Sequence, residues 1–538
     1  FSLQTVRGWI SAFKKISSPS RQSIPGFIGR DYKSVHQTFA SLDPLEKDYL
    51  LEQLAFLSRE QWSQKTGTAS NRPGHAALWI LSEQEKRQQF RMLNYLEITD
   101  NHSDEDPPLL HLRHTEKTPV LSSFRRGDVV VLYPQKFHGQ VSTTQLFKAS
   151  VVSLGKNEIV LKLRARQRNP RAFDHTYWFL EPDYLDSQIQ RNSAGLFAFM
   201  NAEPSKRKSL LNPVGYEPID STDLSYSFEG TDEQKEILRK YICSKEHFLL
   251  WGPPGTGKTS IMLRQMVEWV LNNSRENIML LGYTNRSVDE ICRALNTIDF
   301  LDLDQEVLRV GSRYGTEDEF QHLLIQNKTE NYRDRSQLKE ALKKTRVVCG
   351  TLASISGKPE LFHLKEFQRL IVDEASQILE PQIIGLLPHF DHFCLIGDHH
   401  QLPAIVTQAE EHCHYQSNRL IQCGFQRLSE SLFGRMFRQL SAGNHHHNYA
   451  MLRQQGRMHQ KINALVSRLF YRNKLSILPD EIDRSREQKQ ELKFDLSSKA
   501  SKQSMHHLLA NQRLVFMDVR SRQGFSIEKS SPPEARIV

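Results

Sequence analysis

The sequence predicts an α/β protein whose largest part is a doubly wound parallel sheet, with a small β-barrel on its N-terminal side. Two patterns predict this class. Residues 226–424 alternate strand, loop and amphipathic helix, which is typical of a parallel sheet covered by helices on both faces. Between about 120 and 180, short apolar runs separated by turn residues follow one another, which is typical of a small barrel.

The composition is that of a globular protein with several domains. Of 538 residues, 38% are hydrophobic and 25% are charged, which excludes collagen-like, mucin-like and wholly disordered classes. The net charge of +9 admits a polyanionic partner without demonstrating one. Six scattered cysteines without a CxxC pair favour a reducing compartment. The sequence has no run of 18 apolar residues, so we expect no membrane span and a cytoplasmic protein, nucleoid-associated in a bacterium.

Changes of pattern predict four parts. Amphipathic helices are predicted over Leu45–Phe56 and Trp79–Leu96, and a linker over Asn201–Ser225. Because the chain begins at Phe1 rather than Met, we expect its true N-terminus and any targeting peptide to lie upstream. The predicted parts are a helical N-terminal region (1–112), the barrel with an exit helix (113–205), the parallel-sheet domain with a charged helical insertion at 313–345 (206–424), and the start of a second α/β domain (425–538).

The barrel carries a concentration of positive charge. Six basic residues lie between Lys156 and Arg171, against one acid, Glu158. Such a run is either a solvated face or a patch that follows a nucleic-acid backbone. The basic residues are Lys156, Lys162, Arg164, Arg166, Arg168 and Arg171, and the barrel strands are predicted over Val129–Tyr133, Phe147–Leu154, Glu158–Leu163 and Tyr177–Leu180.

A phosphate-binding loop is the most specific motif. The apolar run Phe248–Trp251 leads into a segment that satisfies G-x-x-x-x-G-K-[ST], and a helix follows. Backbone N–H groups of such a loop close around a phosphate, the lysine reaches the β- and γ-phosphates, and the threonine ligates Mg²⁺. The predicted nucleotide-binding residues are Gly252, Pro253, Pro254, Gly255, Thr256, Gly257, Lys258, Thr259 and Ser260.

Two further motifs follow at strand ends. Leu370-Ile-Val-Asp373-Glu374 is an apolar strand that ends in two carboxylates, of which Asp373 can hold Mg²⁺ and Glu374 can polarise the attacking water. Cys394-Leu-Ile-Gly397-Asp398 is another strand, followed by Gln401, whose amide can sense the γ-phosphate. The three motifs in this order predict hydrolysis of a nucleoside triphosphate, with ATP and Mg²⁺ as cofactors.

From about residue 120 onward, the chain resembles superfamily 1 helicases of the 5′→3′ branch. The closest resemblance is to the replication nuclease–helicases, followed by the nonsense-mediated-decay RNA helicases. The resemblance implies two RecA-like domains, the second one incomplete at its C-terminal end, and a barrel on a helical stalk. The segments that carry it are GPPGTGKT, Tyr283-Thr-Asn285, VDEAS, GDHHQLP, Ser431-Leu-Phe433 and Gln455-Gly-Arg457-Met458-His459.

The resemblance also implies roles for single residues. Gln234 would read the adenine edge, and Gln401 would couple nucleotide state to strand binding. Arg457 would reach the γ-phosphate from the second domain. The basic barrel residues Lys162, Arg164 and Arg166 gain weight as nucleic-acid contacts. The residues implied to grip the backbone of a single strand are Tyr283, Thr284, Asn285, Gly350 and Thr351.

Three departures from the family pattern stand out. Gly456 replaces the usual tyrosine that stacks on the base, which predicts weaker discrimination among nucleoside triphosphates. The segment Lys529–Ala535 lacks the usual Asn before Glu534-Ala535. The chain stops at Val538, where the family continues into its last two motifs.

The leading hypothesis is therefore a monomeric, ATP-driven 5′→3′ helicase on single-stranded DNA, acting in replication or repair. An RNA helicase of the same branch is one alternative. Another is the motor part of a nuclease–helicase, with the nuclease upstream of Phe1. A third is an ATP-gated binding module without strand-stimulated turnover.

Overall fold

The computed structural model describes residues 35–66, 83–88, 90–119, 122–135, 145–155, 157–183, 187–213, 228–330, 335–491 and 513–515. The chain divides into two compact units. The first comprises residues up to 251 together with 259–451, and the second comprises the loop 252–258 together with residues 452–538. No helix within the described ranges combines the length and the apolar run that crossing a bilayer requires.

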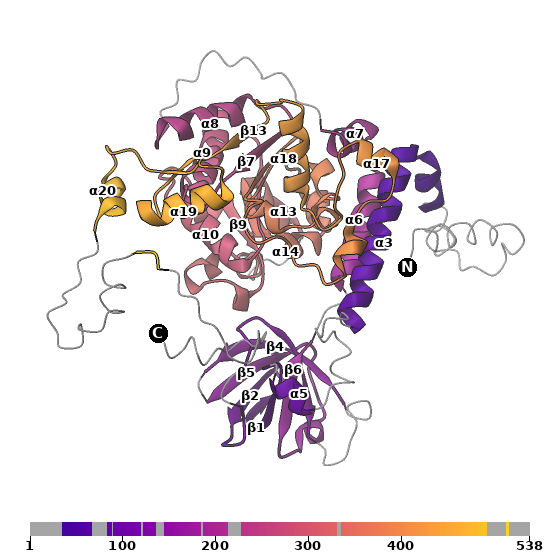
Figure 1. Ribbon diagram of the computed structural model, residues 1–538. Helices are drawn as coiled ribbons and strands as arrows, with labels where there is room; N and C mark the ends of the chain where they lie inside the picture. Colours follow the sequence, from indigo (N-terminus) through magenta and orange to yellow (C-terminus); the bar gives the residue numbers. More distant parts are fainter. Residues whose placement is uncertain are drawn as a thin grey trace, which may run out of the picture. The chain divides into compact units, whose positions relative to one another are not determined.

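Six antiparallel strands form a closed barrel in the first unit, in the order β1-β2-β5-β4-β3-β6 (Figure 1). Its interior is filled by alternating apolar side chains, with Trp178 fully buried beside Phe147 and Phe173. Closure pairs every strand on both sides, which removes exposed sheet edges. The strands are β1 (Leu93–His102), β2 (Leu109–His114), β3 (Val129–Pro134), β4 (Phe147–Leu154), β5 (Glu158–Leu163) and β6 (Trp178–Pro182).

The four barrel strands predicted from the sequence are confirmed, but the start of the barrel is wrong. The boundary at residue 113 and the helix predicted up to Leu96 both miss strand β1, which begins at Leu93. Only a short helix, α5 (Glu83–Gln88), precedes it in the described part of this segment. The buried residues of β1, which include Leu93 and Leu96, do not follow the strict alternation of a half-buried strand, and its exposed end leads to β2 through an acidic segment.

A seven-stranded parallel sheet is the centre of the first unit, in the order β13-β7-β12-β11-β8-β10-β9. Every residue of β8, β10 and β12 is buried, as expected for a parallel sheet covered on both faces. The strands are β7 (His247–Trp251), β8 (Ile278–Gly282), β9 (Val307–Val310), β10 (Val347–Thr351), β11 (Arg369–Val372), β12 (His392–Gly397) and β13 (Tyr449–Met451).

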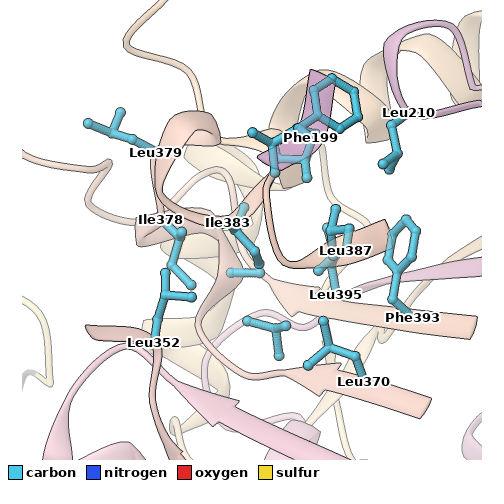
Figure 2. Close-up of a cluster of buried hydrophobic side chains, with 14 of the residues drawn as sticks. Phe199, Leu210, Leu352, Leu370, Ile378, Leu379, Ile383, Leu387, Phe393 and Leu395 are labelled. Carbon is cyan, nitrogen blue, oxygen red and sulfur yellow. The ribbon is translucent and has the colours of Figure 1, made fainter. Parts of the chain in front are cut away.

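One continuous apolar core joins this sheet to the helices around it. Figure 2 shows Phe199 and Leu210, from helices α6 and α7, in the same cluster as Leu370 and Leu395 of β11 and β12. The predicted linker over 201–225 is wrong where helix α7 forms. The predicted exit helix of the barrel is confirmed as α6. The predicted insertion at 313–345 contains helices in its described residues. The larger helices are α6 (Ser187–Met200), α7 (Pro204–Leu211), α8 (Asp232–Cys243), α9 (Arg264–Asn273), α10 (Asn285–Leu295), α13 (Arg335–Lys344) and α18 (Leu432–Ala442); the shorter ones are α11 (Leu303–Glu306), α12 (Ile325–Lys328), α14 (Leu352–Ser356), α15 (Glu360–Leu364), α16 (Glu380–Ile383) and α17 (Asn418–Gln422).

The predicted boundary at residue 425 is wrong, because residues 425–451 belong to the first unit. Strand β13 pairs with β7 at the edge of the sheet, with Tyr449 opposite Leu249. Helix α18 is fixed by a buried ion pair in which the Arg435 guanidinium meets both carboxylate oxygens of Glu380, at 2.6 and 2.8 Å. Both interactions join residues far apart in the chain, which a local pattern does not reveal.

The N-terminal helix α3 (Pro44–Thr66) confirms the predicted helix at Leu45–Phe56 and is part of the first unit. The Tyr49 hydroxyl donates to Glu380 at 2.8 Å, so α3 shares the buried pair that holds α18. Glu60 accepts bonds from the backbone N–H groups of Thr407 and Gln408, at 2.9 and 3.1 Å. Because these bonds tie down the segment that follows Gln401, helix α3 supports the site region from outside the sheet.

The described part of the second unit is small. A two-stranded parallel ribbon joins β14 to β15, and two helices accompany it. The buried Gln488 donates to the carbonyl oxygens of Gln455 and Met458, at 2.8 and 2.9 Å. The elements are β14 (Gln454–Gln455), α19 (Gln460–Phe470), β15 (Ser476–Ile477) and α20 (Asp483–Lys489).

Replacing Arg435 tests whether α18 belongs to the first unit. Arg435→Ala would leave the buried Glu380 carboxylate without its cation, so we expect a loss of about 3–5 kcal/mol in the free energy of unfolding. The matched control is Arg427→Ala, which removes an exposed pair with Glu410 and should cost about 0–1 kcal/mol. Denaturant unfolding measures both, and equal stabilities would contradict the assignment.

Candidate functional site

The carboxyl ends of the parallel strands bring the sequence motifs of the first unit to one edge. In the register of the sheet, Trp251 at the end of β7 lies opposite Gly397 of β12. Val372 of β11 lies opposite Leu395 on one side and Leu281 on the other. The residues that follow these strands therefore lie at the same edge, which is where parallel α/β sheets bind ligands.

The loop 252–258 has the backbone of a phosphate cradle. Gly255 and Gly257 both adopt φ +78°, in the left-handed region that favours glycine. The Thr256 hydroxyl donates to the carbonyl of Pro253 at 2.8 Å, which closes the loop on itself. A side chain at Gly252 would place its Cβ 2.9 Å from the Cβ of Lys258, so only glycine lets the lysine fold back over the loop.

Thr259 and Asp373 meet across the sheet edge. The Thr259 hydroxyl donates to Asp373 Oδ2 at 2.8 Å, and Asp373 is buried. Asp373 is held in place by its own backbone, because its N–H donates to the carbonyl of Leu281 at 2.8 Å. A hydroxyl oxygen next to a carboxylate is a donor set that suits Mg²⁺, a hard cation that prefers oxygen ligands. The residues present therefore fit the predicted cation.

Glu374 adopts a strained conformation beside Asp373. Its φ of 55° is left-handed, which is uncommon outside glycine and is often found at functional sites. Its N–H donates to Asp373 Oδ1 at 3.0 Å, and its carboxylate accepts from the Gln377 amide at 3.2 Å. The two carboxylates thus have different partners, Thr259 for Asp373 and Gln377 for Glu374, so one can serve a cation while the other can serve a water molecule.

Gln401 is oriented by a buried acid, Asp398, which is not among the site residues predicted from the sequence. Its side-chain amide donates to Asp398 Oδ2 at 2.9 Å, and Asp398 has 0% exposure. The predicted γ-phosphate sensor thus has a fixed direction.

Gln234 is placed by a helix cap. In the capping box at the start of α8, its side-chain oxygen accepts from the N–H of Thr231 at 3.0 Å. The family resemblance implies that Gln234 reads the adenine edge, and the cap is a role in addition to the implied one. The signal was present in the sequence, since a threonine followed three residues later by glutamine marks such a cap.

Arg457 lies next to the phosphate loop in the second unit. The N–H of Gly456 donates to the carbonyl of Gly255 at 2.8 Å. The N–H groups of Arg457 and Met458 both donate to the side-chain oxygen of Gln455, at 2.8 and 2.6 Å. This turn brings the backbone of the predicted arginine to the loop.

The segments predicted to grip a nucleic-acid strand lie on neighbouring strand ends. Thr351 at the end of β10 is opposite Gly282 at the end of β8, directly before Tyr283. The hydroxyl of Thr284 caps α10, and that of Thr351 caps α14. A Cβ on Gly350 would lie 2.8 Å from the carbonyl of Val310, so this glycine permits close packing of strands. Asn285 is exposed at the start of α10.

Two of the basic side chains predicted to contact nucleic acid from the barrel already have partners within the chain. Arg166 forms an ion pair with Asp106 at 2.5 Å, and the Lys162 ammonium lies over the ring of Tyr314, 5.2 Å from its centroid. Arg164 is exposed on the loop after β5, and Lys156 lies outside the described residues. The segment 529–535 also lies outside them.

Two families described as AAA domain match the chain, one over residues 230–339 and 324–409 and the other over residues 428–537. The DNA replication ATP-dependent helicase/nuclease DNA2 of Xenopus laevis is 30% identical over 295 residues, which cover 54% of this chain and 26% of that protein. The Homo sapiens protein of the same name is 32% identical over 257 residues, which cover 46% and 21%. The chain thus spans about a quarter of the length of these curated relatives.

Among solved structures, the UvsW helicase from bacteriophage T4 aligns at a TM-score of 0.25 with 15% identity, over 45% of this chain and 70% of that one. Arterivirus nonstructural protein 10 (helicase) aligns at a TM-score of 0.29 with 12% identity, over 69% and 57%.

Gly456 leads to a prediction about nucleotide choice. A Cβ at this position would lie 2.9 Å from Leu478 Cδ1, so an aliphatic side chain fills the space beside the loop and no ring is offered at this position. A stacking face contributes about 1–3 kcal/mol per base, and without it we expect comparable KM values for ATP and GTP in steady-state hydrolysis. A KM for ATP at least about tenfold lower than that for GTP would contradict this expectation.

Proposed function

We propose that this chain, which resembles the superfamily 1 replication nuclease–helicases, is an ATP-dependent motor that moves 5′→3′ on single-stranded DNA in replication or repair. The observation that carries the proposal is the hydrogen bond between Thr259 and Asp373 at the carboxyl edge of the sheet. It joins the end of a phosphate loop to a strand-end carboxylate, which is the arrangement that ATP-hydrolysing motors use to hold Mg²⁺ and phosphate together.

Each site residue then has a task in hydrolysis. The N–H groups of the loop and Lys258 bind the phosphates, and Thr259 and Asp373 would hold Mg²⁺, which neutralises the charge that develops on the phosphate oxygens. Glu374 accepts a proton from the attacking water. Arg457 supplies a second positive charge at the γ-phosphate, which makes closure of the second domain depend on ATP.

Strand binding is proposed at the ends of β8 and β10. Because the hydroxyls of Thr284 and Thr351 cap helices, the backbone of these segments and the exposed Asn285 side chain would contact the nucleic acid. Both segments leave the same sheet edge as Asp373. The proposed strand contacts and the proposed Mg²⁺ ligand therefore lie at the ends of neighbouring strands, β11, β8 and β10. The exposed Arg164 would add a contact from the barrel.

The relatives named above are DNA replication helicase/nucleases, which favours DNA over RNA as the track. They also favour a second proposal, that this chain is the motor part of a nuclease–helicase whose nuclease lies upstream. We propose that the motor acts as a monomer.

ATP hydrolysis with and without a single strand tests the proposal. We expect single-stranded DNA to stimulate phosphate release, and Lys258→Ala to lower the stimulated rate by at least about 100-fold, because the lysine contacts the phosphates in the transition state. The matched control is Arg239→Ala, an exposed basic residue on α8, which should keep the wild-type rate.

The choice of track is tested with matched DNA and RNA duplexes that carry a 5′ or a 3′ tail. Unwinding of the 5′-tailed DNA duplex is the expected result. A Lys258→Ala rate equal to that of the wild type would overturn the ATPase assignment, and unwinding of RNA alone would overturn the choice of DNA.

A further inference from the structure

Trp251 makes a polar contact that the phosphate loop does not require. It is the last residue of β7, and its indole N–H donates to Asp398 Oδ1 at 2.8 Å. Asp398 directly follows β12, the neighbouring strand, and is completely buried. A buried carboxylate must be held by donors, and bonds to a charged group are stronger than those between neutral groups. The indole N–H is therefore part of what keeps this carboxylate in place.

Asp398 distributes its bonds among three motifs. Its Oδ1 also accepts from the N–H of His400 at 3.1 Å, and its Oδ2 accepts from the Gln401 amide at 2.9 Å. Its own N–H donates to the hydroxyl of Ser376, at 3.1 Å, in the turn that follows Asp373 and Glu374. A single buried residue thus touches the strand before the phosphate loop, the turn after the paired carboxylates, and the γ-phosphate sensor.

The approach of these segments is close enough to exclude a side chain. A Cβ on Gly397 would lie 2.8 Å from the N atom of Ser376, so β12 can meet this turn only through glycine. The contact between Asp398 and Ser376 is therefore built into the packing of the strands.

The indole ring is also fixed by its neighbours. Its centroid lies 4.5 Å from that of His399, 5.1 Å from that of His400 and 5.5 Å from that of Phe437. Burial lowers the pKa of His399 to about 4, so this ring is neutral at physiological pH and packs as an aromatic surface. The ring contacts set the plane of the indole, and that plane aims the N–H at Asp398.

The consequence concerns the direction of the Gln401 amide. An amide nitrogen carries two N–H groups, and Asp398 accepts one of them. The bond fixes the rotation of the amide, and with it the direction in which the second N–H points. If the Asp398 carboxylate turned away, the Gln401 amide would be free to rotate and its second N–H would no longer have a fixed direction.

We propose that Trp251 is a positioning residue, which acts through Asp398 to hold the Gln401 amide in the orientation that senses the γ-phosphate. This inference rests on the proposed function and deepens it, because it names how the strand before the phosphate loop controls the sensor. Trp251 touches no reacting atom, so its effect reaches hydrolysis only through Gln401.

A double-mutant cycle tests this path. Trp251→Phe keeps an aromatic ring but removes the N–H, and we expect the kcat of strand-stimulated ATP hydrolysis to fall about 3- to 10-fold with little change in the KM for ATP. In a Gln401→Ala background the same substitution should have no further effect, because the group it positions is gone. The matched control is Trp269→Phe on α9, which should leave kcat unchanged.

Each outcome separates the inference from the proposed function. If Trp251→Phe lowers kcat by the same factor with and without Gln401, or leaves kcat unchanged in the wild-type background, the inference is wrong. If the wild-type chain shows no strand-stimulated hydrolysis, the proposed function itself fails. Should Trp251→Phe unfold, as seen by thermal melting, Asp398→Asn provides the same cycle, because its amide would present a donor to the donating Gln401.

Discussion

Parallel pairing of β7, β12, β11 and β8 is the constraint on which the rest of the first unit depends. Parallel strands end at the same edge, and backbone bonds set which residues stand side by side there. Thr259 can reach Asp373 and Trp251 can reach Asp398 only because this register holds. A change in register would separate these pairs without altering any motif, so the chemistry is a property of the sheet as much as of the side chains.

Buried carboxylates of helix α3, which lies outside the sheet, stabilise the segment that follows the sheet edge. Three carboxylates of α3 accept bonds from the segment that follows Gln401: Glu60 from residues 407–408, Glu52 from the N–H groups of Gln416 and Ser417, and Asp48 from the Ser417 hydroxyl. Burial raises the pKa of Glu52, while the two backbone bonds oppose that rise. Helix α3 therefore holds the segment that follows Gln401 by bonds to its backbone at both ends of residues 407–417.

The motifs were predictable because each is contiguous in the chain. Short patterns with a physical meaning mark the loop 252–259, the pair Asp373–Glu374 and the strand before Gln401. The expected strands around them and the fold class are confirmed. The roles of single site residues stay predictions. Gln234 shows that one residue can fit two patterns, since the spacing of Thr231 and Gln234 also encodes a helix cap.

The remaining features depend on long-range contacts. Strand β13 joins a strand about 200 residues earlier, and the bond between Trp251 and Asp398 spans 147 positions. The bonds of α3 span about 350 positions. Local periodicity does not reveal such pairings, which is why the predicted boundary at 425 was wrong. Strand β1 was missed for a different reason, because its second half is mostly polar and partly exposed, so no apolar alternation marks it as a strand.

The binding of ATP with and without Mg²⁺ tests most directly whether this sheet edge is a nucleotide site. Titration calorimetry on the wild-type chain and on Asp373→Asn, in Mg²⁺ and in a chelator, separates the cation from the rest of the site. We expect Mg²⁺ to raise the affinity of the wild type for ATP by about tenfold or more, and this gain to be largely lost in the variant, because a neutral amide is a poor ligand for a hard cation. The same gain in both proteins would contradict the assignment of Asp373 and Thr259 to the cation.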